Sequence, residues 1–389
     1  MTIRSLSDLP AFGPRPGAAP VRLHELDGLR GWAALSVVAY HLFWEIFAAL
    51  APGFHNVATG FVLDGQLAVS VFFVLSGEAL SAAYFAGKGD VAIYKLAIKR
   101  YPRLVIPILA VCLIVYAICH AGLAYNVPAG DVIGRPDWLG AWLKTLPTIG
   151  DVLTFSFAMV FITNDAATAI NPFLATMMLE LKVSFFVLFL LLTFKHLSNP
   201  RLVLLAVFSA LIMLPSTRNI ACFIAGIIFA DIRWSGGFVA AQKSRFNWIT
   251  WAVIATVGLL DGWLHVRHWH GDYSPIFAII LLTALYCNTR AVAFFTTPLS
   301  MWLGKISFPL FLIQFPIIIS FTSWAIVWTD ANNRLDLPMI WAIALASLAA
   351  CLIAAVIFEP IETLTKWFGN RLIAATTRVW TPRQKAVGS

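Results

Sequence analysis

The sequence predicts an all-α polytopic membrane protein with about ten transmembrane helices and with both termini in the cytoplasm. Of its 389 residues, 60% are hydrophobic and only 12% are charged, whereas soluble domains contain roughly 45–50% and about 25%. The mean hydropathy is +0.82. A soluble domain cannot bury so much apolar surface, and the same excess excludes intrinsic disorder. The net charge of +8 therefore indicates basic loops at a membrane surface rather than nucleic-acid binding.

Ten apolar stretches are candidates for membrane spans, which need about 20 residues each. They are 31–50, 65–84, 104–122, 173–194, 202–215, 219–232, 247–264, 274–288, 306–328 and 338–358. The fifth and sixth are short because Pro215, Arg218 and Asn219 interrupt the run. The apolar patch 152–162 is too short to cross a bilayer, so we expect a re-entrant or interfacial segment there.

The distribution of basic residues predicts the orientation of these spans. If the N-terminus is cytoplasmic, most Lys and Arg residues outside the spans fall on the inside, as the positive-inside rule requires. The first thirty residues also lack the apolar core of a secretory signal peptide. We therefore expect an inner (cytoplasmic) membrane protein with a cytoplasmic tail over 1–28, a transmembrane domain over 29–360 and a second cytoplasmic tail over 361–389.

The first span contains ionisable residues, which are costly inside a membrane and mark functional sites. Arg30 and His41 are eleven residues apart, about 16 Å and three turns along a helix, so they share one face. Glu45 follows His41 by one turn on that face. A carboxylate beside an imidazole can set its tautomer and raise its basicity. The alternative is a histidine that only makes a helix-packing hydrogen bond.

Polar residues also interrupt the second and fourth spans. The second contains Ser76 and Glu78, and the fourth contains Thr176, Glu180 and Ser184 at four-residue intervals. Such a stripe on a helix predicts a protein-lined cavity. The alternative for Glu180 is a structural ion pair with a neighbouring helix.

Two arginines precede the third span in the segment KRYPRLVIP. Arg100 and Arg103 have the planar donor geometry that matches phosphate oxygens, so a phosphate clamp is one interpretation and positive-inside charge alone is the other. The outer segment HVRHWHGDY (265–273) is rich in histidine, but its spacing matches no helical zinc motif, and we expect no metal. The five cysteines are scattered and indicate packing rather than disulfides.

Five segments together resemble the membrane acyltransferase 3 family. They are ELDGLRGWAALSVVAYHLF (25–43), FFVLSG (72–77), KRYPRLVIP (99–107), TMMLELKVS (176–184) and LGKISFPLFLIQFP (303–316). The first carries the arginine, ten residues and histidine that mark the family, here Arg30 and His41. The matches run in the family's order over most of the chain.

The resemblance implies an integral-membrane O-acyltransferase. Such enzymes commonly take an acyl group, most often acetyl, from cytoplasmic acyl-CoA and transfer it to a hydroxyl of a cell-surface glycan or another sugar. No permanently bound cofactor is implied, because acyl-CoA is a substrate. The family's conserved residues carry over to Arg30, His41, Arg100, Arg103 and Glu180.

The sequence departs from the family pattern at four positions. Ala175 replaces a tryptophan, Val183 replaces a glycine, and Glu78 stands where an apolar residue is usual. Gln314 stands where many members have histidine, and a glutamine can hydrogen-bond but cannot carry a proton at neutral pH. We therefore expect Gln314 to have a positioning role at most.

These residues suggest a mechanism for acyl transfer. Arg30, Arg100 and Arg103 would hold the phosphates of the donor, and His41 would act as general base or accept the acyl group itself. Glu45 or Glu180 would orient the imidazole. Hydroxyls would support the oxyanion or the substrate, and the candidates are Thr176, Ser184 and Ser76.

Two other functions fit some of these observations. Ionisable residues in several spans also occur in proton-coupled secondary transporters, although the internal repeats and paired broken helices of that class are not clear here. A non-catalytic membrane scaffold would tolerate replacement of Arg30 and His41.

Overall fold

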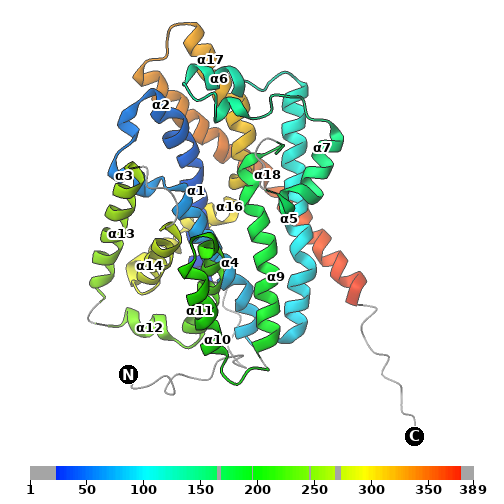
Figure 1. Cartoon of the computed structure of the whole chain (residues 1–389), viewed down its shortest axis with the longest axis vertical. Helices are drawn as coiled ribbons and strands as arrows, with labels where there is room; N and C mark the ends of the chain where they lie inside the picture. The colour runs from blue at the N-terminus through cyan, green and yellow to red at the C-terminus, as the bar shows by residue number, and fades with distance from the viewer. Residues whose placement is uncertain (1–22, 164–167, 195, 245–246, 268–272, 378–389) are drawn as a thin grey trace.

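The computed structural model describes residues 23–163, 168–194, 196–244, 247–267 and 273–377. Within these ranges the chain forms helices and the turns between them, without a β-strand. Figure 1 shows most of the long helices running from the upper to the lower end of the molecule. This arrangement agrees with the all-α membrane fold that the composition predicts.

The helices follow one another along the whole described chain. They are α1 (His24–Ala39), α2 (Ala48–Leu50), α3 (Val57–Val62), α4 (Gly65–Phe85), α5 (Gly89–His120), α6 (Asn126–Val132), α7 (Ile149–Thr154), α8 (Val160–Ile162), α9 (Met177–Phe194), α10 (Pro200–Met213), α11 (Arg218–Trp234), α12 (Gly237–Gln242), α13 (Ile249–Val266), α14 (Ser274–Tyr286), α15 (Thr289–Phe295), α16 (Pro298–Ile317), α17 (Ser323–Ala331) and α18 (Leu337–Thr377). Three π-helical segments continue or join them, namely η2 (Tyr40–Phe47), η5 (Phe155–Met159) and η8 (Ile318–Thr322).

Seven helices of the described chain are long and apolar enough to cross a membrane, or eight if one bent pair counts as a span. The seven run over His24–Leu50, Val57–Phe85, Gly89–His120, Pro172–Phe194, Ile249–Val266, Pro298–Ala331 and Leu337–Thr376. The expected number of about ten also included α10 and α11, which have only 14 and 17 residues. The count of ten and the orientation of the termini stay predictions.

The first helix of the bent pair coincides with the span that the sequence predicts over 274–288, and the second lies in the segment that follows it. Helix α14 ends at Tyr286, and α15 leaves at an angle of 99°. Asn288 makes this bend, because its side chain accepts hydrogen bonds from the backbone N–H groups of Arg290 and Ala291, both at 3.0 Å. A residue that caps a new helix ends the previous one.

The apolar patch 152–162 forms part of a short helix over Ile149–Ile162. At 1.5 Å per residue this helix is about 21 Å long, which is less than the roughly 30 Å of a bilayer core. It packs against α5, beside the upper part of that helix (Figure 1). The length agrees with the predicted re-entrant or interfacial segment.

Helices α1 and α16 cross closely at the centre of the bundle. A side chain on Gly31 would meet the backbone N of Gly304 at 2.4 Å, so the two backbones touch without side chains between them. Small residues at helix crossings allow this approach in membrane proteins. The same crossing places the C-terminal half of α16 beside the segment that carries His41.

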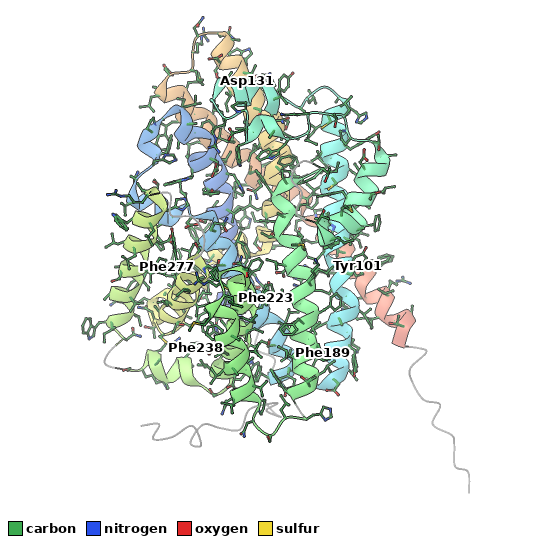
Figure 2. The ribbon with its side chains drawn as sticks, viewed as in Figure 1. Tyr101, Asp131, Phe189, Phe223, Phe238 and Phe277 are labelled. Atoms are coloured by element: carbon green, nitrogen blue, oxygen red, sulfur yellow. The ribbon has the colours of Figure 1, made fainter. Side chains whose placement is uncertain are left out.

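The outer surface of the bundle is apolar, as a lipid-facing surface must be. Phe189 on α9 is 62% exposed and points outward, whereas Phe223 on α11 is fully buried at the centre (Figure 2). Phe223 packs where α4 and α11 cross, and a side chain on Gly77 of α4 would meet its carbonyl oxygen at 2.0 Å. We therefore interpret the exposed apolar side chains as the surface that contacts lipid.

Candidate active site

His41 lies at the start of a π-helical segment. The α-helical pattern of α1 ends at Ala39, and η2 begins at Tyr40. A π-helix has a wider turn than an α-helix and is rare, and short π-helical segments are frequent at functional sites. The segment turns His41 toward α16, whose Gln314 lies opposite.

A hydrogen bond to Gln314 fixes the imidazole of His41. Nδ1 of His41 is 3.0 Å from Oε1 of Gln314, and the amide nitrogen of Gln314 donates to the carbonyl of Phe311 at 2.9 Å. Because the amide donates on one side, its oxygen can only accept on the other. Nδ1 therefore carries the hydrogen in a neutral imidazole, and the lone pair of Nε2 is available as a base.

Aromatic rings enclose the imidazole. The ring of Phe173 stacks on His41 with a centroid distance of 3.8 Å and an interplanar angle of 7°. Trp138 is also nearly parallel to the imidazole, at 6.3 Å. Such rings restrict the orientation of the imidazole and exclude water from one of its faces.

A cavity of about 310 Å³ lies on the side of Arg30. Its wall is formed by residues of α1, α4, α5, α16, α18 and the start of α9. His41 is not part of the cavity wall, but Phe311 is. The carbonyl of Phe311 accepts a hydrogen bond from the amide of Gln314, and the same amide is hydrogen-bonded to His41. Two hydrogen bonds thus connect the cavity to the imidazole.

Two arginines on the cavity wall already have protein partners. Arg30 donates to the carbonyl of Leu75 at 3.1 Å. Arg100 forms an ion pair with Glu180, and Ser76 donates to the same carboxylate at 2.9 Å. A buried ion pair of this kind needs such extra hydrogen bonds to offset desolvation.

The remaining cations of the wall are Arg103, Lys305 and Lys366. Arg103 is exposed and makes no hydrogen bond or ion pair within the part of the chain that the structure describes. Sequence reasoning did not single out the two lysines, because nothing in a single sequence places residues 305 and 366 beside Arg103.

Glu45 and Glu180 do not contact the imidazole through the hydrogen bonds of the described residues. Tyr40 donates to Glu45, and Arg135 pairs with Glu45 at 3.2 Å. Glu180 binds Arg100 and Ser76, as described above. These contacts give no support to the interpretation that a carboxylate orients His41, since Gln314 occupies Nδ1.

The predicted hydroxyl groups have different surroundings. Thr176 and Ser76 both line the cavity. Ser184 is buried and donates to the backbone carbonyl of Glu180, and it is not part of the cavity wall. The structure thus brings Arg30, Arg100, Arg103, Ser76, Thr176 and Glu180 together at one cavity, and His41 with Gln314 beside it.

Glu78 belongs to a separate buried network. It accepts hydrogen bonds from Arg233 at 2.6 Å and from Tyr286 at 2.8 Å, and Arg233 also pairs with Glu25 at 2.5 Å. The guanidinium of Arg233 lies 4.5 Å from the ring centroid of Tyr286. The departure from the family pattern at Glu78 therefore has a structural partner on α11.

The histidine-rich outer segment is only partly described. His265 pairs with Asp64 at 3.2 Å, and Asp64 also caps α4. His268, His270 and Asp272 lie outside the described residues. Among those described, no three His, Cys, Asp or Glu residues form a group that could hold a metal ion.

Comparison with known proteins identifies the family. The model of the membrane acyltransferase 3 family, an acyltransferase domain, matches residues 23–359. No curated protein and no solved structure matches the chain. The match covers most of the sequence, from the start of α1 to the middle of α18. The chain therefore belongs to the membrane acyltransferase 3 family and is a multi-pass membrane acyltransferase.

Proposed function

We propose that this protein is an O-acyltransferase of the inner (cytoplasmic) membrane. It transfers an acyl group, acetyl in the first instance, from cytoplasmic acyl-CoA to a hydroxyl of a cell-surface glycan or another sugar-containing acceptor. The observation that carries the proposal is the fixed imidazole of His41, whose Nδ1 is bonded to Gln314 beside a cavity lined with cations. A base of set tautomer next to a site for an anionic donor is what acyl transfer to a hydroxyl needs.

The reaction begins with removal of a proton from the acceptor hydroxyl by Nε2 of His41. The hydroxyl oxygen attacks the thioester carbonyl, a C–O bond forms, and the C–S bond breaks. The sulfur leaves as a thiolate and takes the proton from the imidazolium. In the alternative order, Nε2 first accepts the acyl group and then passes it to the acceptor. Gln314 positions the imidazole in both orders.

Groups on the cavity wall assist the thioester. Thr176 lines the cavity and has a hydroxyl that can donate to the oxyanion. Ser76 also lines the cavity, but its hydroxyl hydrogen is already donated to Glu180. The oxyanion is the species whose charge develops in the transition state, so donors aimed at it lower the barrier. Glu180 has a positioning role, because it holds both Arg100 and Ser76.

The first experiment measures release of free coenzyme A from acetyl-CoA by the purified protein in vesicles. A cell-envelope extract supplies the unknown acceptor. We expect His41→Ala to abolish release, since a general base contributes about 10²–10⁴-fold. The matched control is His120→Ala, because His120 is an exposed histidine at the end of α5 whose one hydrogen bond among the described residues is to the Tyr116 carbonyl.

The outcomes of this experiment distinguish an acyltransferase from a transporter. Release that depends on His41 and on the extract supports acyl transfer. Substantial release by His41→Ala would remove His41 from the central role. Uptake of a solute by the same vesicles without consumption of coenzyme A would contradict the donor assignment.

A further inference from the structure

The cations of the cavity wall fall into two groups. Arg30 and Arg100 are bound to protein oxygens, as described above. Arg103, Lys305 and Lys366 are exposed, the two lysines at 63% and 72% of their side chains. They come from α5, α16 and α18, three helices that pack against one another. The exposed group therefore marks the mouth of the cavity, and the bound group marks its interior.

The two lysines have partners that a stronger anion can displace. Lys305 pairs with Glu359 at 3.4 Å, and Lys366 pairs with Glu362 at 3.7 Å. Ion pairs between exposed side chains contribute little, because water and salt screen them. A phosphate group carries more charge than a carboxylate and has more acceptor oxygens, so it binds ammonium and guanidinium groups more tightly.

The interior of the cavity has a different character. Phe72, Leu104, Phe308 and Phe311 line it together with the bound arginines. A ligand that fits this arrangement has phosphate groups at one end and a long, weakly polar arm that enters the cavity. Coenzyme A has this construction, with a diphosphate and a ribose 3′-phosphate at one end of the pantetheine arm.

We propose that Lys305 and Lys366, together with Arg103, bind the phosphate groups of the donor at the mouth of the cavity. This inference rests on the proposed function. It assigns to Lys305 and Lys366 the phosphate-binding role that the sequence predicts for Arg30 and Arg100. Those two arginines instead shape the interior through which the thioester arm passes.

The test compares two donors that share the thioester arm. Acetyl-CoA carries the phosphates, and S-acetylpantetheine lacks them. We expect Lys305→Ala and Lys366→Ala each to raise KM for acetyl-CoA by about tenfold, as for the loss of a hydrogen bond between charged groups. KM for S-acetylpantetheine should stay the same. Lys95→Ala is the matched control, because Lys95 is an exposed lysine on α5 that does not line the cavity.

A second variant should change KM for acetyl-CoA in the opposite direction. Glu362→Gln removes the carboxylate that competes for Lys366, so we expect KM for acetyl-CoA to fall by about threefold. Direct binding of adenosine 3′,5′-bisphosphate, which has phosphates but no thioester, should tighten in Glu362→Gln and weaken in both lysine variants. This measurement does not depend on turnover.

The outcomes distinguish this inference from the proposed function. If the lysine variants impair both donors equally, or if neither changes KM for acetyl-CoA, the phosphate assignment is overturned while acyl transfer stands. If the unmodified protein neither binds the bisphosphate nor turns over either donor, the proposed donor itself is wrong.

Discussion

At the scale of single residues, the departure at Gln314 has a chemical explanation. The family resemblance implies a histidine at this position in many members. A histidine can carry a proton, whereas a glutamine cannot. In this chain the amide of Gln314 donates to Phe311 and accepts from Nδ1 of His41. It therefore sets the tautomer of His41 without carrying a proton, and a single base at Nε2 is enough for the reaction.

This interpretation predicts the behaviour of two substitutions. Gln314→Leu removes the acceptor for Nδ1–H, so we expect kcat to fall at least about tenfold, the kinetic equivalent of one lost hydrogen bond. Gln314→Glu keeps an acceptor oxygen and should retain activity. Gln66→Leu, at an exposed position on α4, serves as the control. Equal activity of the Leu and Glu variants would show that the hydrogen bond does not matter for catalysis.

The ion pair of Arg100 with Glu180 allows a test of stability. Glu180→Ala leaves Arg100 buried without its partner, which costs about 3–5 kcal/mol. Replacing both residues by leucine removes the charges together and should restore most of the thermal stability, but not the activity. The measurement is the melting temperature of each variant in detergent. A double variant that is no more stable than Glu180→Ala would contradict this role for the pair.

At the scale of helices, the crossing of α1 and α16 determines whether the site forms at all. His41 and Gln314 are 273 residues apart in the chain, and they meet because the two backbones touch at Gly31 and Gly304. Any side chain at this point forces the helices apart and lengthens the hydrogen bond that fixes the imidazole.

Gly31→Ala is the corresponding test. Its new methyl group would lie 2.4 Å from a backbone nitrogen, and overpacking of this kind costs about 1–3 kcal/mol. We expect a lower melting temperature and a lower kcat. Gly53→Ala is the control, since a methyl group there would have nothing within 4 Å. If Gly31→Ala and Gly53→Ala behave alike, the crossing is not tight.

The helices were more predictable from the sequence than their contacts. Apolar length alone indicates most of the spans, because each must satisfy its backbone within the bilayer. The sequence does not predict the bend at Asn288, since an asparagine that caps a helix looks like any polar residue at the end of a span. Nor does the sequence predict the partner of Glu45, because Arg135 lies 90 residues away in an outer segment without regular hydrophobic periodicity.

At the scale of the whole molecule, the short connections fall at two ends. Figure 1 shows α6 and α17 at the upper end and α12 at the lower end. The connection around α12 carries Lys243 and Arg245, and the upper connections carry Arg135 and Arg334. Charge near the ends of spans sets their orientation, so the excess of basic residues in the loops expected inside predicts that the lower end is cytoplasmic.

Labelling of introduced cysteines tests this orientation. Lys243→Cys lies at the lower end and Ala331→Cys at the upper end, and both positions are exposed. Of the native cysteines, four are buried and Cys287 is half-buried, so the unmodified chain gives the background. An impermeant maleimide applied to intact cells should label Ala331→Cys, whereas Lys243→Cys should react only after the membrane is opened. Arg103 and Lys305 directly precede the predicted spans 104–122 and 306–328, and Lys366 follows the last span, so all three belong to the side expected inside. The reverse pattern would place them on the outer side, away from cytoplasmic acyl-CoA, and would exclude the proposed donor.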